Sequence, residues 1–154
     1  MKTNWKQQSR NILGVFLLML SFGVQAQQEQ NKGIIFNEDS WEEILQLAQA
    51  ENKGIFLDVY ASWCGPCKAL KNRSFPDEKA GQFYNENFIN VSMDAEKGEG
   101  IQLARQLRVD AYPSLFFLNS KGEVVLLAQG FHNAEELIEL GKEGLSTLEN
   151  HSGK

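Results

Sequence analysis

The chain has 154 residues, of which 42% are apolar and 23% are charged, a balance typical of one globular domain with a modest core. The formal net charge is −5, but three of the 15 basic residues lie in the first 26 positions, which leaves 12 against all 20 acidic residues. So acidic a remainder excludes binding to a nucleic-acid backbone, which requires clustered Lys and Arg.

The first 26 residues have the three parts of a secretory signal peptide. A basic start is followed by an apolar run over residues 12–24 and by a small-residue end at Ala26. We therefore expect an exported, periplasmic protein that is cleaved near Ala26. An uncleaved anchor is the alternative, although the apolar run is short for a membrane span of roughly 20 residues.

The remaining sequence predicts one domain over residues 34–149, between a polar, flexible leader at 27–33 and a tail at 150–154. Its first predicted element is a helix over residues 41–52, because Ser40 and Glu43 form a capping box before apolar residues at helical spacing.

A short, nearly continuous apolar run at 55–60 predicts a strand that is covered on both faces, and Asp58 is its one acidic residue. A helix is expected over residues 64–74, since Pro66 fits the first turn of a helix. Helix 77–87 and strand 88–93 follow.

An acidic, Gly-rich loop at 94–100 leads into a short helix marked by apolar residues from Ile101 to Leu107. Residues 114–118 and 123–128 predict a β-hairpin, and Asn133 begins a last helix. This order of elements predicts an α/β fold with a mixed central sheet and helices on both faces.

The only two cysteines, Cys64 and Cys67, are three positions apart. They are too few for a four-cysteine zinc site, and His132 and His151 lack zinc-finger spacing, so we expect surface histidines and neither a metal nor another cofactor. A structural disulfide is the alternative in an exported protein. A bridge that closes so small a loop stabilises a fold weakly, which favours redox chemistry.

The run from Trp63 to Cys67 reads Trp-Cys-Gly-Pro-Cys and lies where a predicted strand meets a helix. Together with Asp58 six residues earlier, Pro113 before the hairpin and Gly122 in its turn, it resembles the thioredoxin family. The resemblance covers roughly residues 34–140 and implies a thioredoxin-like fold and thiol–disulfide oxidoreductase activity.

Helix-terminal N–H groups favour a thiolate, so Cys64 is the expected nucleophile, exposed to solvent, and Cys67 the shielded resolving cysteine. The resemblance implies that Asp58 is the buried base that deprotonates Cys67, with a pKa raised towards neutrality. A solvent-facing acid is the alternative for Asp58. The substrate-binding residues implied by the resemblance are Trp63, Gly65, Pro66, Tyr112 and Pro113.

In the family the proline is cis and leaves the preceding backbone, here that of Tyr112, free to pair with an extended substrate segment. An ordinary trans Pro113 and a purely packing role for Trp63 are the alternatives. The chain departs from ordinary thioredoxin at Asn90, where a lysine is frequent, and at Asn72, where a mid-helix proline is frequent. Ser114 replaces the more usual threonine.

The break at 75–78 and the loop at 94–97 resemble exported domains related to the soluble end of membrane thiol–disulfide reductases. We therefore expect a monomeric protein-disulfide reductase of cell redox homeostasis that acts on disulfide-containing proteins and receives electrons from a membrane thiol donor. A net oxidase or isomerase is one alternative. A non-catalytic interaction module with a structural disulfide is the other.

Overall fold

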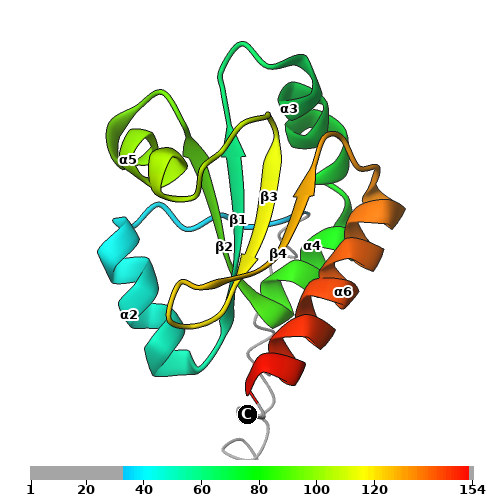
Figure 1. Ribbon diagram of the computed structural model, residues 1–154. Coiled ribbons are helices and arrows are strands. Elements are labelled where there is room, and N and C mark those ends of the chain that lie inside the picture. The colour runs from blue at the N-terminus through cyan, green and yellow to red at the C-terminus, as the bar shows by residue number, and fades with distance from the viewer. Residues whose placement is uncertain (1–32, 153–154) are drawn as a thin grey trace, which may run out of the picture. The chain divides into compact units, whose positions relative to one another are not determined.

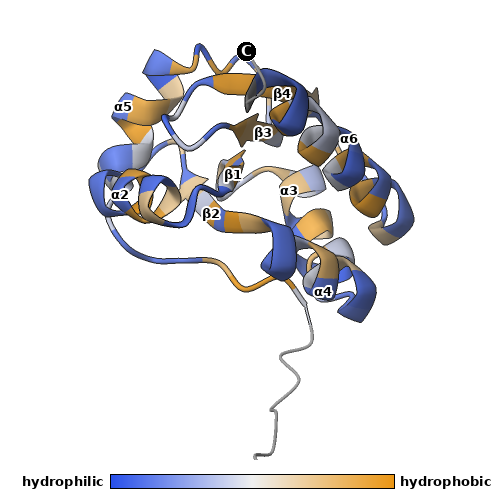
Figure 2. Cartoon of the chain, turned by 90° about the horizontal axis from the view of Figure 1, so that it is seen from below, coloured by the Kyte–Doolittle hydropathy of each residue, from blue (hydrophilic) through white to orange (hydrophobic). Residues whose placement is uncertain are grey.

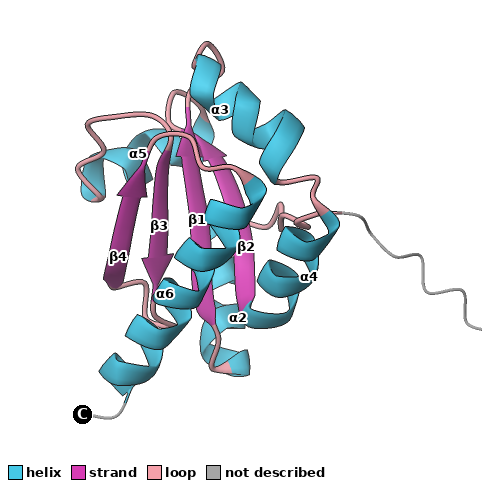
Figure 3. Cartoon of the chain, turned by 90° about the vertical axis from the view of Figure 1, so that its right-hand side faces the viewer, coloured by secondary structure: helices cyan, strands magenta, loops and turns pink. Residues whose placement is uncertain are grey.

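The computed structural model describes residues 33–152, so the expected signal peptide and all but the last residue of the leader lie outside the described residues. Four strands form one sheet in the order β2-β1-β3-β4: β1 (Gly54–Tyr60), β2 (Phe88–Asp94), β3 (Ser114–Leu118) and β4 (Val124–Gln129). β1 runs parallel to β2 and antiparallel to β3, and β4 is antiparallel to β3 (Figure 3).

Helices cover both faces of this sheet, which confirms the predicted mixed α/β architecture (Figure 1). Helices α2 (Trp41–Glu51) and α5 (Gly98–Gln106) lie on one face, and α4 (Glu78–Asn87) and α6 (Ala134–Ser152) lie on the other. Hydrophobic and hydrophilic residues alternate around these helices, as Figure 2 shows, because each helix turns only one side to the sheet.

The strand β1 divides its apolar side chains between two cores. Ile55, Leu57 and Val59 pack with α2 and α5, whereas Phe56 packs into an aromatic cluster with Tyr84 of α4 and residues of α6. Asp58 alternates with them and therefore lies on the same face as Phe56. A strand covered on both faces explains the nearly continuous apolar run in its sequence.

The predicted helix over residues 64–74 is the largest departure from expectation. It is α-helical only in α3 (Gly65–Ala69) and continues as a π-helical turn, η1 (Leu70–Ser74). The N–H of Phe75 donates to the carbonyl of Leu70 at 2.9 Å, five residues back. Leu70 and Ser74 are both buried, and the Ser74 hydroxyl donates to the carbonyl of His132 at 2.6 Å.

Three boundaries also differ from the sequence-based expectation. Gly33 is already buried, against the backbone of Phe75 and Pro76, so packing begins within the expected leader. The loop expected at 94–100 is shorter, because α5 begins at Gly98. Helix α6 continues through the expected start of the tail to Ser152, since Leu148 packs into the core only one turn earlier.

The predicted hairpin turn is confirmed: the N–H of Gly122 donates to the carbonyl of Asn119 at 2.9 Å, and Gly122 has a positive φ of 82°. Helix α6 begins with a reciprocal cap in which Asn133 Oδ1 accepts the N–H of Glu136, whose carboxylate accepts the N–H of Asn133. His132 is half-buried, and its carbonyl accepts the Ser74 hydroxyl, whereas His151 is exposed as expected.

Candidate active site

The carboxyl end of β1 lies close to the start of α3 (Figure 1), and the cysteine pair lies at that helix start. Cys64 and Cys67 are joined by a disulfide, with their Cα atoms 5.4 Å apart. Cys64 is the N-cap of α3, and its Sγ accepts a hydrogen bond from the N–H of Cys67 at 3.2 Å. Pro66 occupies the first turn, where its missing N–H costs no helical hydrogen bond.

The expected contrast in exposure between the two cysteines is wrong. Cys64 is 3% exposed and Cys67 6%, because both pack in one small cluster with Ala61 against the rings of Tyr60 and Tyr112. Solvent access therefore does not distinguish nucleophile from resolver in the disulfide form. The two cysteines still differ in their position on the helix. Cys64 is the N-cap, and its sulfur accepts the N–H of Cys67.

Asp58 is a buried acid at the centre of β1. Only 4% of the residue is exposed, so the alternative of a solvent-facing acid is wrong. Its Oδ2 accepts a hydrogen bond from the Ser92 hydroxyl at 2.8 Å, and no described residue donates to its Oδ1. Burial raises the pKa of Asp58 to about 7, against the opposing effects of the Ser92 hydrogen bond and the charge of Lys71.

Sequence reasoning missed Ser92, which is the nearest polar partner of Asp58. The parallel pairing of β1 with β2 places Asp58 directly beside Ser92, 34 positions further along the chain. A strand register of this kind is not visible in either strand alone, because it depends on the crossover that connects them.

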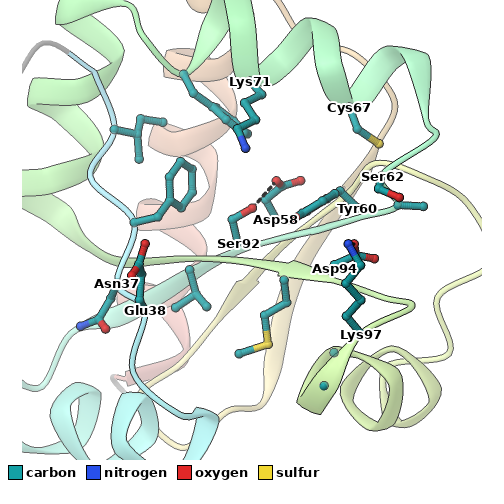
Figure 4. A pocket seen from close by; sticks show the side chains of 18 of the residues that line it. Asn37, Glu38, Asp58, Tyr60, Ser62, Cys67, Lys71, Ser92, Asp94 and Lys97 are labelled. Carbon is teal, nitrogen blue, oxygen red and sulfur yellow. Dashed lines mark hydrogen bonds and ion pairs between the residues drawn. The ribbon is translucent and has the colours of Figure 1, made fainter.

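An open groove of about 930 Å³ lies beside Cys67 and Asp58 (Figure 4). Its walls come from the segment after Gly33, from β1 and β2, from α3 and η1, and from the start of α5. Cys67 and Asp58 both line this groove, whereas Cys64 does not. The groove thus connects Cys67, the expected resolving cysteine, rather than Cys64 with the buried acid.

On the other side of the disulfide, the Tyr112–Pro113 peptide bond is cis, as the resemblance implies. Pro113 is buried, and its carbonyl accepts the N–H of Gly130 at 2.9 Å. Among the described residues, neither the N–H nor the carbonyl of Tyr112 has a hydrogen-bond partner. This backbone can therefore pair with an extended segment of another protein.

The remaining substrate-binding candidates surround the disulfide at the surface. Trp63 is 66% exposed, which contradicts a purely packing role. Its indole N–H donates to the carboxylate of Glu96 at 2.9 Å, and its ring lies edge-on to that of Tyr112, with centroids 5.9 Å apart. Gly65 and Pro66 are exposed, and a side chain at Gly65 would meet no atom within 4 Å.

Two of the departures from ordinary thioredoxin, Asn90 and Asn72, have different structural outcomes. The amide of Asn90 donates to the carbonyl of Ile35 at 3.3 Å and to Asn85 Oδ1 at 3.0 Å, so Asn90 holds the segment after Gly33 against β2. Asn72 lies in the π-helical turn η1 and is exposed.

Comparison with known proteins places the chain in a family. The thioredoxin-like domain family matches residues 41–144, and the chain belongs to this family. A solved structure described as a putative disulphide-isomerase from Bacteroides thetaiotaomicron is 44% identical, covers 73% of this chain and 93% of that one, and has a TM-score of 0.65.

Two further similar proteins carry the name DsbD, and the first of them is named thiol:disulfide interchange protein DsbD. That of Yersinia enterocolitica is 31% identical over 124 residues, which are 77% of this chain and 22% of the relative. The oxidised C-terminal domain of Neisseria meningitidis DsbD shares the fold, with a TM-score of 0.58 at 23% identity, and covers 72% of this chain and 98% of that domain. The chain thus spans about a fifth of the length of the curated DsbD relatives.

Family membership and the paired cysteines together define a thiol–disulfide oxidoreductase of the thioredoxin-like class. Within residues 33–152, no three His, Cys, Asp or Glu side chains gather in a way that could hold a metal ion. None of the helices in that range is long and apolar enough to cross a membrane.

Proposed function

We propose that the chain is a net protein-disulfide reductase of the periplasm that acts on disulfides of exported proteins. The observation that supports disulfide exchange through this pair is the placement of Cys67 and the buried Asp58 on one groove, with Cys64 at the start of the helix. The Gly-Pro dipeptide between the cysteines supports the reducing direction by its resemblance to reducing thioredoxins.

The reaction begins from the reduced dithiol. The Cys64 thiolate attacks one sulfur of the substrate disulfide, forms a mixed disulfide and displaces the first substrate thiolate. Cys67 then gives its proton to the Asp58 carboxylate and attacks Cys64 Sγ, which releases the second substrate thiolate. Two electrons have passed to the substrate, and the chain holds the Cys64–Cys67 disulfide that the structure shows.

The substrate segment lies along the backbone of Tyr112, with Trp63 and the open surface at Gly65 beside the reacting sulfurs. The chain works as a monomer. Because a reductant in an oxidising compartment must be recharged, a membrane thiol donor returns two electrons to the disulfide. The similarity to proteins named for thiol:disulfide interchange supports such relays.

The assignment of the two cysteines is tested by turnover of insulin disulfides and by trapping of partners. Cys64→Ser should abolish turnover and trap nothing. Cys67→Ser should also fail to turn over, yet accumulate mixed disulfides, because it attacks and cannot resolve. Equal trapping by both variants would show that the assignment is wrong, and turnover by neither the unmodified protein nor its variants would favour a structural disulfide.

The 44% identity to a putative disulphide-isomerase favours isomerisation as a second candidate. The equilibrium reduction potential of the Cys64–Cys67 pair separates the two. A potential near that of thioredoxin, about −270 mV, supports the reductase, and one near that of protein disulfide isomerase, about −180 mV, supports the isomerase.

A further inference from the structure

Three lysines line the groove beside Cys67, and they are placed differently. Lys97 of the turn before α5 pairs with Asp94, whose carboxylate lies 3.1 Å from the Lys97 Nζ. Lys68 and Lys71 both belong to the helix that carries Cys67. Of the three, Lys71 is the lysine whose charge lowers the pKa of Asp58.

The position of Lys71 follows from the geometry of the helix. It comes four residues after Cys67, so both side chains lie on one side of the helix, over the groove. Figure 4 shows the Lys71 ammonium turned towards Asp58 from the helix side, while the Ser92 hydroxyl binds the same carboxyl group from β2. Asp58 therefore lies between a hydrogen-bond donor and a cation.

Other charged and titratable groups also face the groove, and they come from every element that forms it. Those of the segment after Gly33 and of α5 are exposed acids, whose fields water screens. The full set, apart from Asp58 and Lys71, is Glu38, Asp39, Tyr60, Cys67, Lys68, Asp94, Lys97 and Glu99.

We propose that Lys71 is a positioning residue for the resolving step, and that its charge keeps Asp58 in the carboxylate form that accepts the proton of Cys67. This inference rests on the proposed role of Asp58 as the base. A carboxyl group buried to this degree favours the protonated form, which cannot accept a proton. The Lys71 ammonium, which is turned towards Asp58 from the helix side, opposes that preference.

The first test measures the pKa of Asp58 directly, by carboxyl ¹³C NMR on the oxidised full-length chain. Lys71→Met should raise this pKa by on the order of 0.5 unit, a modest shift because Lys71 is exposed. Lys71→Arg should retain the unmodified value, and so should Lys68→Met, the matched control on the same helix. An equal pKa in Lys71→Met and Lys68→Met would overturn the proposal.

The salt dependence of the pKa of Asp58 tests the proposal independently. Raising the salt concentration to 1 M should move the pKa of Asp58 in the unmodified protein towards that of Lys71→Met, because ions screen an exposed lysine. The same salt should leave the value in Lys71→Met nearly unchanged. An equal salt response in both proteins would contradict an electrostatic role for Lys71.

The second test follows resolution itself, as release of a peptide from a mixed disulfide with Cys64 between pH 5 and 9. Lys71→Met should slow release about threefold below pH 7, and should match the unmodified protein above pH 8, where Asp58 is ionised in both. In an Asp58→Asn background, Lys71→Met should have no further effect.

These rates distinguish failure of the inference from failure of the proposed function. If Asp58→Asn does not slow release, Asp58 is not the base, and both the catalytic proposal and the part given to Lys71 are wrong. If Asp58→Asn slows release but Lys71→Met and Lys68→Met have the same pH profile as the unmodified protein, only the inference about Lys71 is wrong.

Discussion

The two faces of the β1–β2 pair are built from the same alternating strands but serve different purposes. Towards α2 and α5 the pair presents apolar side chains at every position, from Ile55 to Val59 on β1 and from Ile89 to Met93 on β2. Towards α3 and η1 it presents Asp58 and Ser92. One face is therefore apolar throughout, whereas the other carries a buried acid, the proposed base of the cysteine chemistry.

The raised pKa of Asp58 means that burying this acid lowers the free energy of unfolding near neutral pH. A carboxyl group with a pKa of about 7 in the folded state and its ordinary value near 3.8 in the unfolded state binds more protons when folded between these two values. Asp58 therefore lowers the free energy of unfolding as pH rises from about 4 to 7. The apolar face has no such pH dependence, and this contrast can be tested residue by residue.

The largest expected effect is on the apolar face. Leu57→Ala should lower the free energy of unfolding by about 2–5 kcal/mol, because Leu57 is fully buried and its removal leaves a cavity. Urea unfolding measures this loss, which should be the same at pH 5 and pH 8. A loss that differs between the two pH values would mean that the faces are not independent.

Asp58→Asn is the corresponding change on the other face, and its expected sign is opposite. It should raise the free energy of unfolding at pH 8 by about 2–4 kcal/mol, since Asn retains the polar contact with Ser92 and carries no buried charge. At pH 4, where Asp58 is protonated, the gain should vanish. The same variant should slow resolution of mixed disulfides. A variant that is both more stable and fully active would contradict the proposal that Asp58 lowers stability but is needed for the reaction.

Ser92→Ala is the smallest and most local change. It removes the hydroxyl that donates to Asp58 Oδ2, so the pKa of Asp58 should rise further. The variant should lose about 1–2 kcal/mol of the free energy of unfolding at pH 8 and less at pH 5, because a charged acceptor loses more than a neutral one. Equal losses at the two pH values would indicate that Ser92 stabilises β2 and not the carboxylate.

Local patterns in the sequence were sufficient to predict most of the helices and strands and the reactive cysteine pair. The Ser40–Glu43 capping box, the apolar run of β1 and the turn at Gly122 each depend on residues within a few positions of one another, and the structure confirms them. The Cys64–Cys67 pair is local in the same sense, because a bond across three positions of one helix requires no other part of the chain.

What only the tertiary structure decided depends on contacts between distant segments. The π-helical turn η1 accompanies the burial of Leu70 and Ser74, and Ser74 finds its partner in the carbonyl of His132, 58 positions away. The two cysteines are similarly buried because the chain comes back to the start of α3 at Tyr112, whose ring packs against them. The environment of Asp58 is set by the parallel register of β1 and β2 and by Lys71 across the groove, and neither pairing leaves a period or a motif in the sequence.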